Sequence, residues 1–239
     1  MEEKLETLRK WTGESDNIVF FGGAGVSTES GVPDFRGTGG LYRQEYAYPP
    51  EKILSHSFFR QNPEEFFRFY RAKMLPLDAQ PNPAHRKLAQ WEREGKLKAV
   101  ITQNIDGLHQ AAGSREVLEL HGSVHRNYCT KCGAFYDGAY MKAAAGVPHC
   151  PQCGGLIKPD VVLYEESLNG ATMEKALNYL QNAEVLIIGG TSLAVYPAAG
   201  LVTYYHGDKL VLLNKDPTPY DSHANLALNL PIGQVLGSL

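Results

Sequence analysis

The chain has 239 residues, of which 43% are hydrophobic and 21% are charged, and its formal net charge is -3. That length allows one large core with a smaller lobe and excludes two large domains. The charge gives no overall attraction to nucleic acid or to an anionic membrane, so we expect no specific nucleic-acid partner and no membrane partner.

The first twenty residues carry many charges and no apolar stretch, unlike a signal peptide. The sequence contains no run of about 18 apolar residues, so it predicts no membrane span. We therefore expect a cytoplasmic protein.

Short hydrophobic runs recur along the chain, and each ends in polar residues or glycines. They predict strands at residues 18–21, 99–102, 117–120, 185–188 and 210–213. Continuous apolar runs are typical of strands buried on both faces, and helical patterns at 83–94 and 172–181 lie between them. The sequence therefore predicts an α/β fold with a doubly wound parallel sheet, in which ligands bind beyond the carboxyl ends of the strands.

The first predicted strand leads into a glycine-rich segment. Glycines after a strand let the backbone approach a pyrophosphate, and a helix start presents free N–H groups to it. Residues 23–28 (GAGVST) lack the third glycine of the dinucleotide fingerprint, so a plain glycine-rich turn is an equally good interpretation of this motif alone. The continuation at 30–37 (SGVPDFRG) adds an aromatic residue and a cation that a turn does not need.

The four cysteines form two Cys-x-x-Cys pairs, Cys129 with Cys132 and Cys150 with Cys153. This spacing is typical of a closed tetrahedral zinc site, and a reducing compartment favours thiolate–metal bonds over disulfides. Four thiolates fill the coordination shell, so we expect one structural Zn2+ and place the neighbouring His125 and His149 outside it.

Taken together, the motifs resemble the sirtuin family of NAD-dependent protein-lysine deacylases, of the bacterial type. The resemblance covers about residues 15–236 and rests on 23–36 (GAGVSTESGVPDFR), 102–109 (TQNIDGLH), 121–122 (HG), the two cysteine pairs and 190–193 (GTSL), in that order.

The resemblance implies a division of the chain into two parts. A Rossmann-like NAD-binding domain would comprise residues 1–36, 85–122 and 157–239. A helical insertion at 37–84 and a zinc ribbon at 123–156 would form the smaller lobe. The cosubstrate NAD and an acyl-lysine peptide would meet between the two parts.

The resemblance also implies which residues contact NAD. Those near the phosphates and riboses would be Gly23, Ala24, Gly25, Thr28, Gln103, Asn104, Gly190, Thr191, Ser192 and Asn214. Those near the nicotinamide and its ribose would be Asp34, Phe35, Arg36, Ile105, Asp106 and His121. Ile232 would contact the adenine.

His121 directly follows a predicted strand, where the ligand should lie. Nicotinamide leaves while the acyl oxygen of the substrate attacks, and a ribose hydroxyl must later lose a proton, a task that suits an imidazole. We therefore expect His121 to be the general base, and the resemblance adds Asn104 as a second catalytic residue. The implied products are nicotinamide and O-acetyl-ADP-ribose.

Two departures from the family pattern concern the acyl-peptide substrate. Lys73, not arginine, lies three positions after Tyr70, so the bidentate fork that binds acidic acyl groups is absent. We therefore expect acetyl and other neutral acyl groups. Glu165 replaces the glycine of a Phe-Gly-Glu segment that clamps the peptide, and its charge predicts a preference for peptides with basic residues.

Three alternative functions share parts of this pattern. An NAD-dependent ADP-ribosyltransferase would use the same site, although the intact His121 argues against it. A dehydrogenase is disfavoured by the missing third glycine. A non-catalytic zinc-ribbon peptide-binding module leaves the polar strand ends unexplained. We expect a monomer, because one chain supplies both sides of the crevice.

Overall fold

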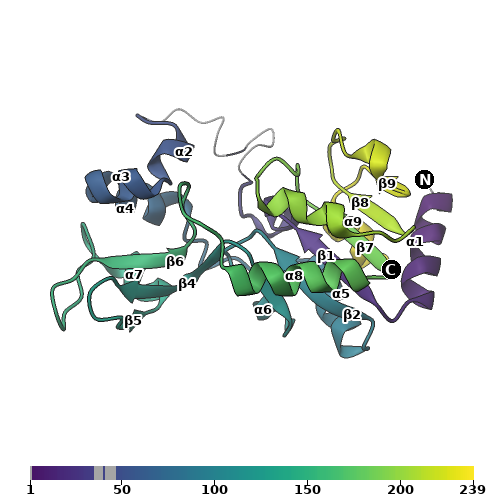
Figure 1. Cartoon of the computed structure of the whole chain (residues 1–239), viewed down its shortest axis with the longest axis horizontal. Helices are drawn as coiled ribbons and strands as arrows, with labels where there is room; N and C mark the ends of the chain where they lie inside the picture. Colours follow the sequence, from purple (N-terminus) through teal and green to yellow (C-terminus); the bar gives the residue numbers. More distant parts are fainter. Residues whose placement is uncertain (1, 35–39, 41–46) are drawn as a thin grey trace.

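The computed structural model describes residues 2–34, 40 and 47–239, and a six-stranded parallel sheet runs through its larger part (Figure 1). The sheet order is β3-β2-β1-β7-β8-β9. Its strands are β1 (Ile18–Gly22), β2 (Leu97–Thr102), β3 (Val117–Glu119), β7 (Val185–Gly189), β8 (Leu210–Leu213) and β9 (Leu226–Leu228). The chain runs outward in opposite directions from β1 and from β7, so the switch point of a doubly wound sheet lies between these two strands.

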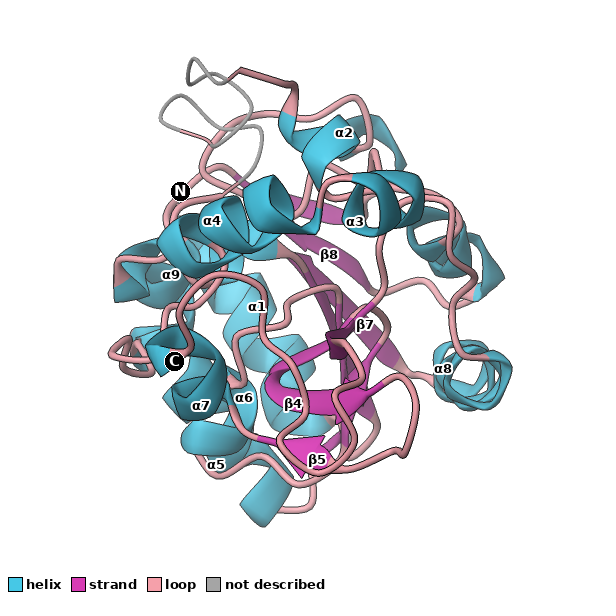
Figure 2. Ribbon diagram, turned by 90° about the vertical axis from the view of Figure 1, so that its left-hand side faces the viewer, coloured by secondary structure: helices cyan, strands magenta, loops and turns pink. Residues whose placement is uncertain are grey.

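Helices cover both faces of this sheet (Figure 2). On one face lie α1 (Glu2–Glu14), α5 (Pro83–Arg93) and α9 (Ile232–Gly237), and on the other lie α8 (Gly170–Asn182) and the 3-10 helix η4 (Ala198–Tyr204). Side chains of β1 alternate between the faces: Phe20 packs with the core that contains Leu88, and Phe21 packs with the core that contains Leu180. The predicted α/β doubly wound sheet is confirmed.

A second, three-stranded antiparallel sheet forms the smaller lobe, on the left in Figure 1. Its order is β5-β4-β6, and helices α2, α3, α4 and α7 accompany it. The bounds are β4 (Gly122–Cys129), β5 (Phe135–Tyr136), β6 (Ile157–Val161), α2 (Pro50–Ile53), α3 (His56–Gln61), α4 (Pro63–Lys73) and α7 (Gly138–Ala143). The predicted boundary between 156 and 157 thus falls just before β6, which pairs with β4 in the smaller sheet.

The aromatic residues of α3 and α4 form the core of this lobe, as their helical spacing predicts. All six are buried: Phe58, Phe59, Phe66, Phe67, Phe69 and Tyr70. The rings of Phe59 and Phe66 meet edge to face with centroids 5.0 Å apart, while Phe66 and Tyr70 stack at 5.7 Å. They share one core with Val124 and Ile157 of the sheet, so α3, α4 and the three-stranded sheet pack as a unit.

Asn-Pro pairs start two of the helices. Asn62 precedes α4 and accepts a hydrogen bond from the Glu65 N–H, and Asn82 precedes α5 and accepts one from the Ala84 N–H. Asparagine is a favoured N-cap, and proline at the first helical position has no N–H to satisfy. Local sequence therefore fixes where these helices begin.

Further short helices among the described residues are α6 (Leu108–Ala111), η1 (Ala24–Val26), η2 (Thr28–Ser30) and η5 (Asp221–His223). Within the described residues, no helix is both long and apolar enough to cross a membrane.

Candidate active site

Two glycine-containing loops meet at the carboxyl ends of β1 and β7. The Gly25 N–H donates to the Gly190 carbonyl at 2.7 Å, and a Cβ on Gly25 would lie 2.8 Å from the Gly190 Cα. Only residues without side chains allow this approach. The loops thus come together at the switch point, where an open α/β sheet binds its ligand.

A buried polar cluster lies beside these loops. The Ser27 hydroxyl donates to the Asp106 carboxylate at 2.7 Å and accepts from the Asn104 side-chain amide at 3.1 Å. The other Asp106 oxygen accepts from the Leu108 N–H at 2.9 Å. Ser27, Asn104 and Asp106 are all buried, and buried polar groups held by such hydrogen bonds have fixed positions.

His121 is bonded to the residue that precedes Asn104 in the chain. Its Nδ1 is 3.0 Å from the Gln103 carbonyl oxygen. A carbonyl can only accept, so Nδ1 carries the hydrogen and Nε2 keeps a lone pair in the neutral ring. Burial lowers the pKa of His121 below its ordinary value of 6.5, although the contact with Gln103 acts in the opposite sense. The ring is therefore neutral near pH 7 and offers Nε2 as a base.

Residues after β2, β7 and β8 hold one another at the same edge of the sheet. The Asn214 side chain accepts from the Thr191 N–H at 2.9 Å and donates to the Thr191 carbonyl at 3.1 Å. The Gln103 amide donates to the Thr191 hydroxyl at 3.3 Å. The structure thus brings together three residues predicted from separate motifs.

The other residues predicted to contact NAD differ in how much of each is exposed to solvent. Thr28 and Ser192 are exposed, Ala24 and Asp34 are half-buried, and Ile105 packs against the core of the smaller lobe. Ile232 is buried in the core of the larger part at the start of α9. Phe35 and Arg36 lie outside the described residues.

Three contacts were not predicted from the sequence. Ser27 belongs to the glycine-rich motif but received no role, although a small hydroxyl side chain between buried strand ends is a signal for such a contact. His125, expected only to lie outside the zinc site, has its Nε2 2.9 Å from the Asp106 carbonyl oxygen. The Val124 N–H donates to the Ile105 carbonyl at 3.0 Å. Strand β4 therefore contacts the main chain of the predicted nicotinamide pocket.

The four cysteines meet at the other end of the smaller lobe. All four Sγ atoms lie within 4.8 Å of one another, with Cys129 and Cys153 at 3.4 Å and Cys132 and Cys150 at 3.6 Å. Tetrahedral coordination with Zn–S bonds of about 2.3 Å separates sulfurs by about 3.8 Å. The set fits one structural zinc ion, and neither His125 nor His149 belongs to it.

A tyrosine supports this thiol cluster. The Tyr136 hydroxyl lies 3.0 Å from the Cys150 Sγ, and this contact lowers the pKa of Cys150 to about 6. The Lys131 N–H donates to the Cys129 Sγ at 3.4 Å. Hydrogen bonds to sulfur stabilise the thiolate form, which is the form that binds metal.

Comparisons with known proteins agree with this arrangement. The model of the Sir2 family matches residues 23–197. An NAD-dependent protein deacetylase of Clostridium acetobutylicum is 55% identical over 98% of this chain and 97% of its own length. One of Clostridium tetani is 56% identical over 98% of this chain and 96% of its own length.

A solved structure described as "Sir2-p53 peptide-NAD+" superposes with a TM-score of 0.85. Its chain is 39% identical, and the match covers 97% of this chain and 95% of that one. The family model spans most of the chain, from the glycine loop to the segment after β7, and the relatives extend the match to nearly every residue. The chain therefore belongs to the Sir2 family.

Proposed function

We propose that this chain is an NAD-dependent protein-lysine deacetylase that releases nicotinamide and forms O-acetyl-ADP-ribose. The observation that carries the proposal is the buried cluster of Ser27, Asn104 and Asp106, together with the neutral His121 that is bonded to the main chain of Gln103, at the carboxyl ends of the strands. Clostridial relatives more than half identical in sequence are NAD-dependent protein deacetylases, which supports the same activity here.

The residues at the switch point fit a dinucleotide. Gly23, Ala24, Gly25, Thr28 and Gly190 would hold the phosphates with Thr191 and Ser192, and Gln103 and Asn214 would hold ribose hydroxyls. This assignment is supported by the close approach of the two loops and by the hydrogen bonds that join Asn214, Thr191 and Gln103. Ile232 is proposed at the adenine end and Asp34, Phe35 and Arg36 at the nicotinamide ribose.

NAD supplies an activated glycosidic bond whose cleavage drives the removal of the acyl group. Asp106 and Ile105 would hold the nicotinamide carboxamide, and Asn104 would orient the reacting ribose. His121 would act as general base through Nε2, because its Nδ1 hydrogen is directed to the Gln103 carbonyl. The contact between Nδ1 and Gln103 fixes the ring orientation that such a proton transfer requires.

We propose acetyl-lysine and other neutral acyl-lysines in peptides and proteins as substrates. Tyr70 is fully buried in the aromatic core of the smaller lobe and contributes no cation that could pair with an acidic acyl group. Lys73 provides no bidentate fork for a carboxylate. Strand β6 forms an edge of the described three-stranded sheet, next to His121, and an extended peptide can add to such an edge.

The four cysteines would hold one zinc ion with a structural role, because four thiolates leave no open coordination position. Reduced thiols at such a site suit the cytoplasm. We also propose that the protein acts as a monomer without a specific nucleic-acid partner. Its division would be a Rossmann-like domain and a smaller lobe, with β6 counted in the smaller lobe because it pairs with β4.

Mass spectrometry of an acetyl-lysine peptide, with and without NAD, tests the proposal. We expect NAD-dependent loss of the acetyl group and formation of O-acetyl-ADP-ribose, and we expect His121→Ala to lower the rate at least about 100-fold. His206→Ala, at an exposed histidine outside the motifs, is the matched control and should keep the rate.

Two other outcomes would favour the alternatives. Consumption of NAD with ADP-ribose added to protein, while the peptide stays acetylated, would indicate an ADP-ribosyltransferase. Peptide binding without any consumption of NAD would indicate a non-catalytic module.

A further inference from the structure

The segment after β6 contains a tight turn with an unusual third residue. The Glu166 N–H donates to the Leu163 carbonyl at 3.0 Å, and Glu165 has a φ of 76°. A left-handed third residue and this hydrogen bond are the features of a type II turn, which normally has glycine at that position. An L side chain at such a position is disfavoured unless other contacts hold it there.

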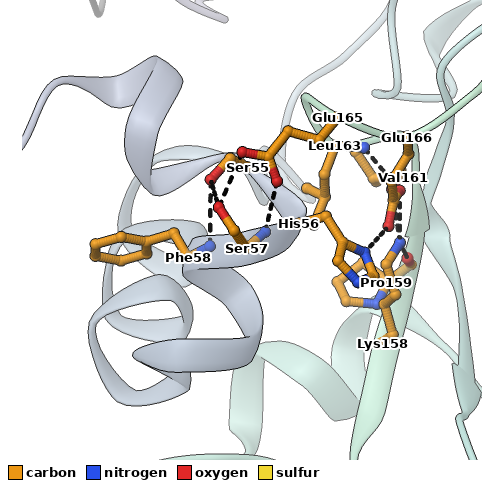
Figure 3. A network of polar contacts seen from close by, with 10 residues as sticks. All are labelled: Ser55, His56, Ser57, Phe58, Lys158, Pro159, Val161, Leu163, Glu165 and Glu166. Carbon is orange, nitrogen blue, oxygen red and sulfur yellow. Dashed lines mark hydrogen bonds and ion pairs between the residues drawn. The ribbon is translucent and has the colours of Figure 1, made fainter.

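The Glu165 side chain makes those contacts with the smaller lobe's helix α3 (Figure 3). One carboxylate oxygen accepts from the Ser57 N–H at 2.8 Å, and the other accepts from the Ser57 hydroxyl at 2.9 Å. The N–H groups of a first helical turn have no partner within the helix, so this carboxylate satisfies one of them. Hydrogen bonds to a charged carboxylate are stronger than those between neutral groups.

Further contacts join the same turn to the start of α3. The Tyr164 N–H donates to the Leu54 carbonyl and the His56 N–H donates to the Tyr164 carbonyl, each at 2.9 Å. Glu166 lies 2.8 Å from the His56 Nδ1 and 3.1 Å from the Lys158 Nζ, and it accepts from the Leu163 N–H. Main-chain and side-chain bonds thus hold the turn on two sides.

The other end of this segment is bonded to the proposed general base. The Val162 N–H donates to the His121 carbonyl at 3.0 Å, and Val161 pairs with Gly122 in the sheet. Only two residues, Leu163 and Tyr164, separate Val162 from Glu165. A displacement of the turn from α3 would therefore move the main chain that borders His121.

We infer that Glu165 is a positioning residue for the acyl-lysine substrate. By holding the turn at residues 163–166 on Ser57, it fixes Val162 and Leu163 beside His121, where the substrate peptide has to place its acyl group. The inference rests on the proposed deacetylase function. The preference for basic peptides stays a separate prediction, because the Glu165 carboxylate is bonded to α3 while the residue itself is exposed.

The experiment compares four variants by steady-state kinetics and by the anisotropy of a labelled acetyl-lysine peptide. Glu165→Ala and Glu165→Gly both remove the carboxylate, and we expect each to raise the peptide KM and Kd about tenfold, with the KM for NAD changed less than about twofold. Glu165→Gln keeps an oxygen for the Ser57 N–H, so we expect a rise of about threefold or less.

Ser57→Ala removes one of the two bonds, and we expect a rise of about threefold in the peptide KM. In the Glu165→Ala background the same substitution should have a smaller effect, because only the contact of the Ser57 hydroxyl with the Ser55 hydroxyl, at 3.2 Å, is left to lose. Glu174→Ala, at an exposed carboxylate on α8, is the matched control, and circular dichroism checks that each variant is folded.

Two results would overturn the inference. A peptide KM and Kd unchanged in both Glu165→Ala and Glu165→Gly would show that the contact does not position the substrate. If Glu165→Ala bound the peptide weakly while Glu165→Gly bound it as the wild type does, the cause would be strain of the alanine backbone at this left-handed position and not loss of the carboxylate. Failure of the wild type to deacetylate would instead reject the proposed function, so the two failures are distinguishable.

Discussion

The six-stranded sheet and the three-stranded sheet differ in how they exclude water. In the larger sheet, every residue of β1 and β7 is buried, with packed helices on both faces. In the smaller sheet, β5 has two residues, and Tyr128 and Phe135 remain 40% and 57% exposed. Small sheets of this kind need additional stabilisation, which here comes from the aromatic core of α3 and α4 and from the cysteine cluster.

Because of this contrast, we expect the two parts of the molecule to respond to different perturbations. The larger side depends on apolar burial, and the smaller side depends on a metal and on ring packing. Both tryptophans of the chain, Trp11 and Trp91, pack in the core of the larger part, so tryptophan fluorescence reports on that part alone. Hydrogen exchange in β4 and β6 reports on the smaller lobe.

The largest expected effect is that of metal loss. Structural zinc sites bind with about 10–16 kcal/mol, so Cys150→Ser or a strong chelator should remove the metal and abolish protection of β4 and β6 from exchange. The urea transition seen by tryptophan fluorescence should shift little. If metal removal abolished both the exchange protection of β4 and β6 and the tryptophan-detected urea transition, the larger sheet would also depend on the metal.

A matched pair of core truncations should separate the two regions. Phe66→Ala in the smaller lobe and Ile187→Ala in β7 both remove fully buried side chains and should cost about 2–5 kcal/mol each. Ile187→Ala should lower the tryptophan-detected free energy of unfolding and leave the zinc content at one ion per chain. Phe66→Ala should accelerate exchange in the smaller lobe. If both variants changed tryptophan-detected unfolding and hydrogen exchange in the smaller lobe equally, the two parts would not be stabilised separately.

Acidification should weaken the larger part through two buried histidines. Burial lowers the pKa of His85 to about 4 and that of His109 well below 6.5, and their rings lie 4.8 Å apart. Because the unfolded chain binds protons at these sites below pH 6.5 and the folded chain does not, the free energy of unfolding decreases as the pH falls. For each histidine, the decrease should reach about 1.4 kcal/mol per pH unit.

Tryptophan-detected urea unfolding between pH 7.5 and 5, at saturating zinc, measures this slope. His109→Phe removes one titrating ring of similar size and should reduce the slope. An unchanged slope in that variant would exclude His109 as a source of the acid sensitivity.

The smallest expected effects are those of helix caps. Asn169 accepts from the Thr172 N–H at the start of α8, and Asp137 accepts from the Tyr140 N–H at the start of α7. Replacing either by alanine should cost about 1 kcal/mol. Asn169→Ala should change the tryptophan-detected transition, whereas Asp137→Ala should change exchange in the smaller lobe. If Asn169→Ala instead changed exchange in the smaller lobe, or Asp137→Ala changed the tryptophan-detected transition, the two regions would not be independent.

Sequence reasoning predicted the strands whose apolar runs are unbroken. The run predicted at 210–213 coincides with β8, and the one at 185–188 differs from β7 by one residue. It did not predict β9 (Leu226–Leu228), which is only three residues long, or α1 (Glu2–Glu14), which buries only Leu8 and Thr12. In β6, Lys158 and Asp160 interrupt the apolar pattern because this strand lies at an edge of the smaller sheet.

For the site, motifs indicated which residues matter but not what they contact. His121, Asn104 and Asp106 were predicted from strand ends and from the family resemblance. The hydrogen bonds of Ser27 to Asp106 and of Glu165 to Ser57 join residues far apart in the chain, and no local pattern encodes such pairs. The folded chain was needed to reveal them.

The place of β1 in the sheet has a consequence for synthesis on the ribosome. β1 pairs with β7 along one edge, but the segments that form the smaller lobe are translated before β7 at residues 185–189. A nascent chain therefore carries β1 with one hydrophobic edge unpaired until nearly four-fifths of the protein has been made. Such an edge invites association with other chains. Slower translation or chaperone binding during this interval should decide how much of the protein is recovered in native form.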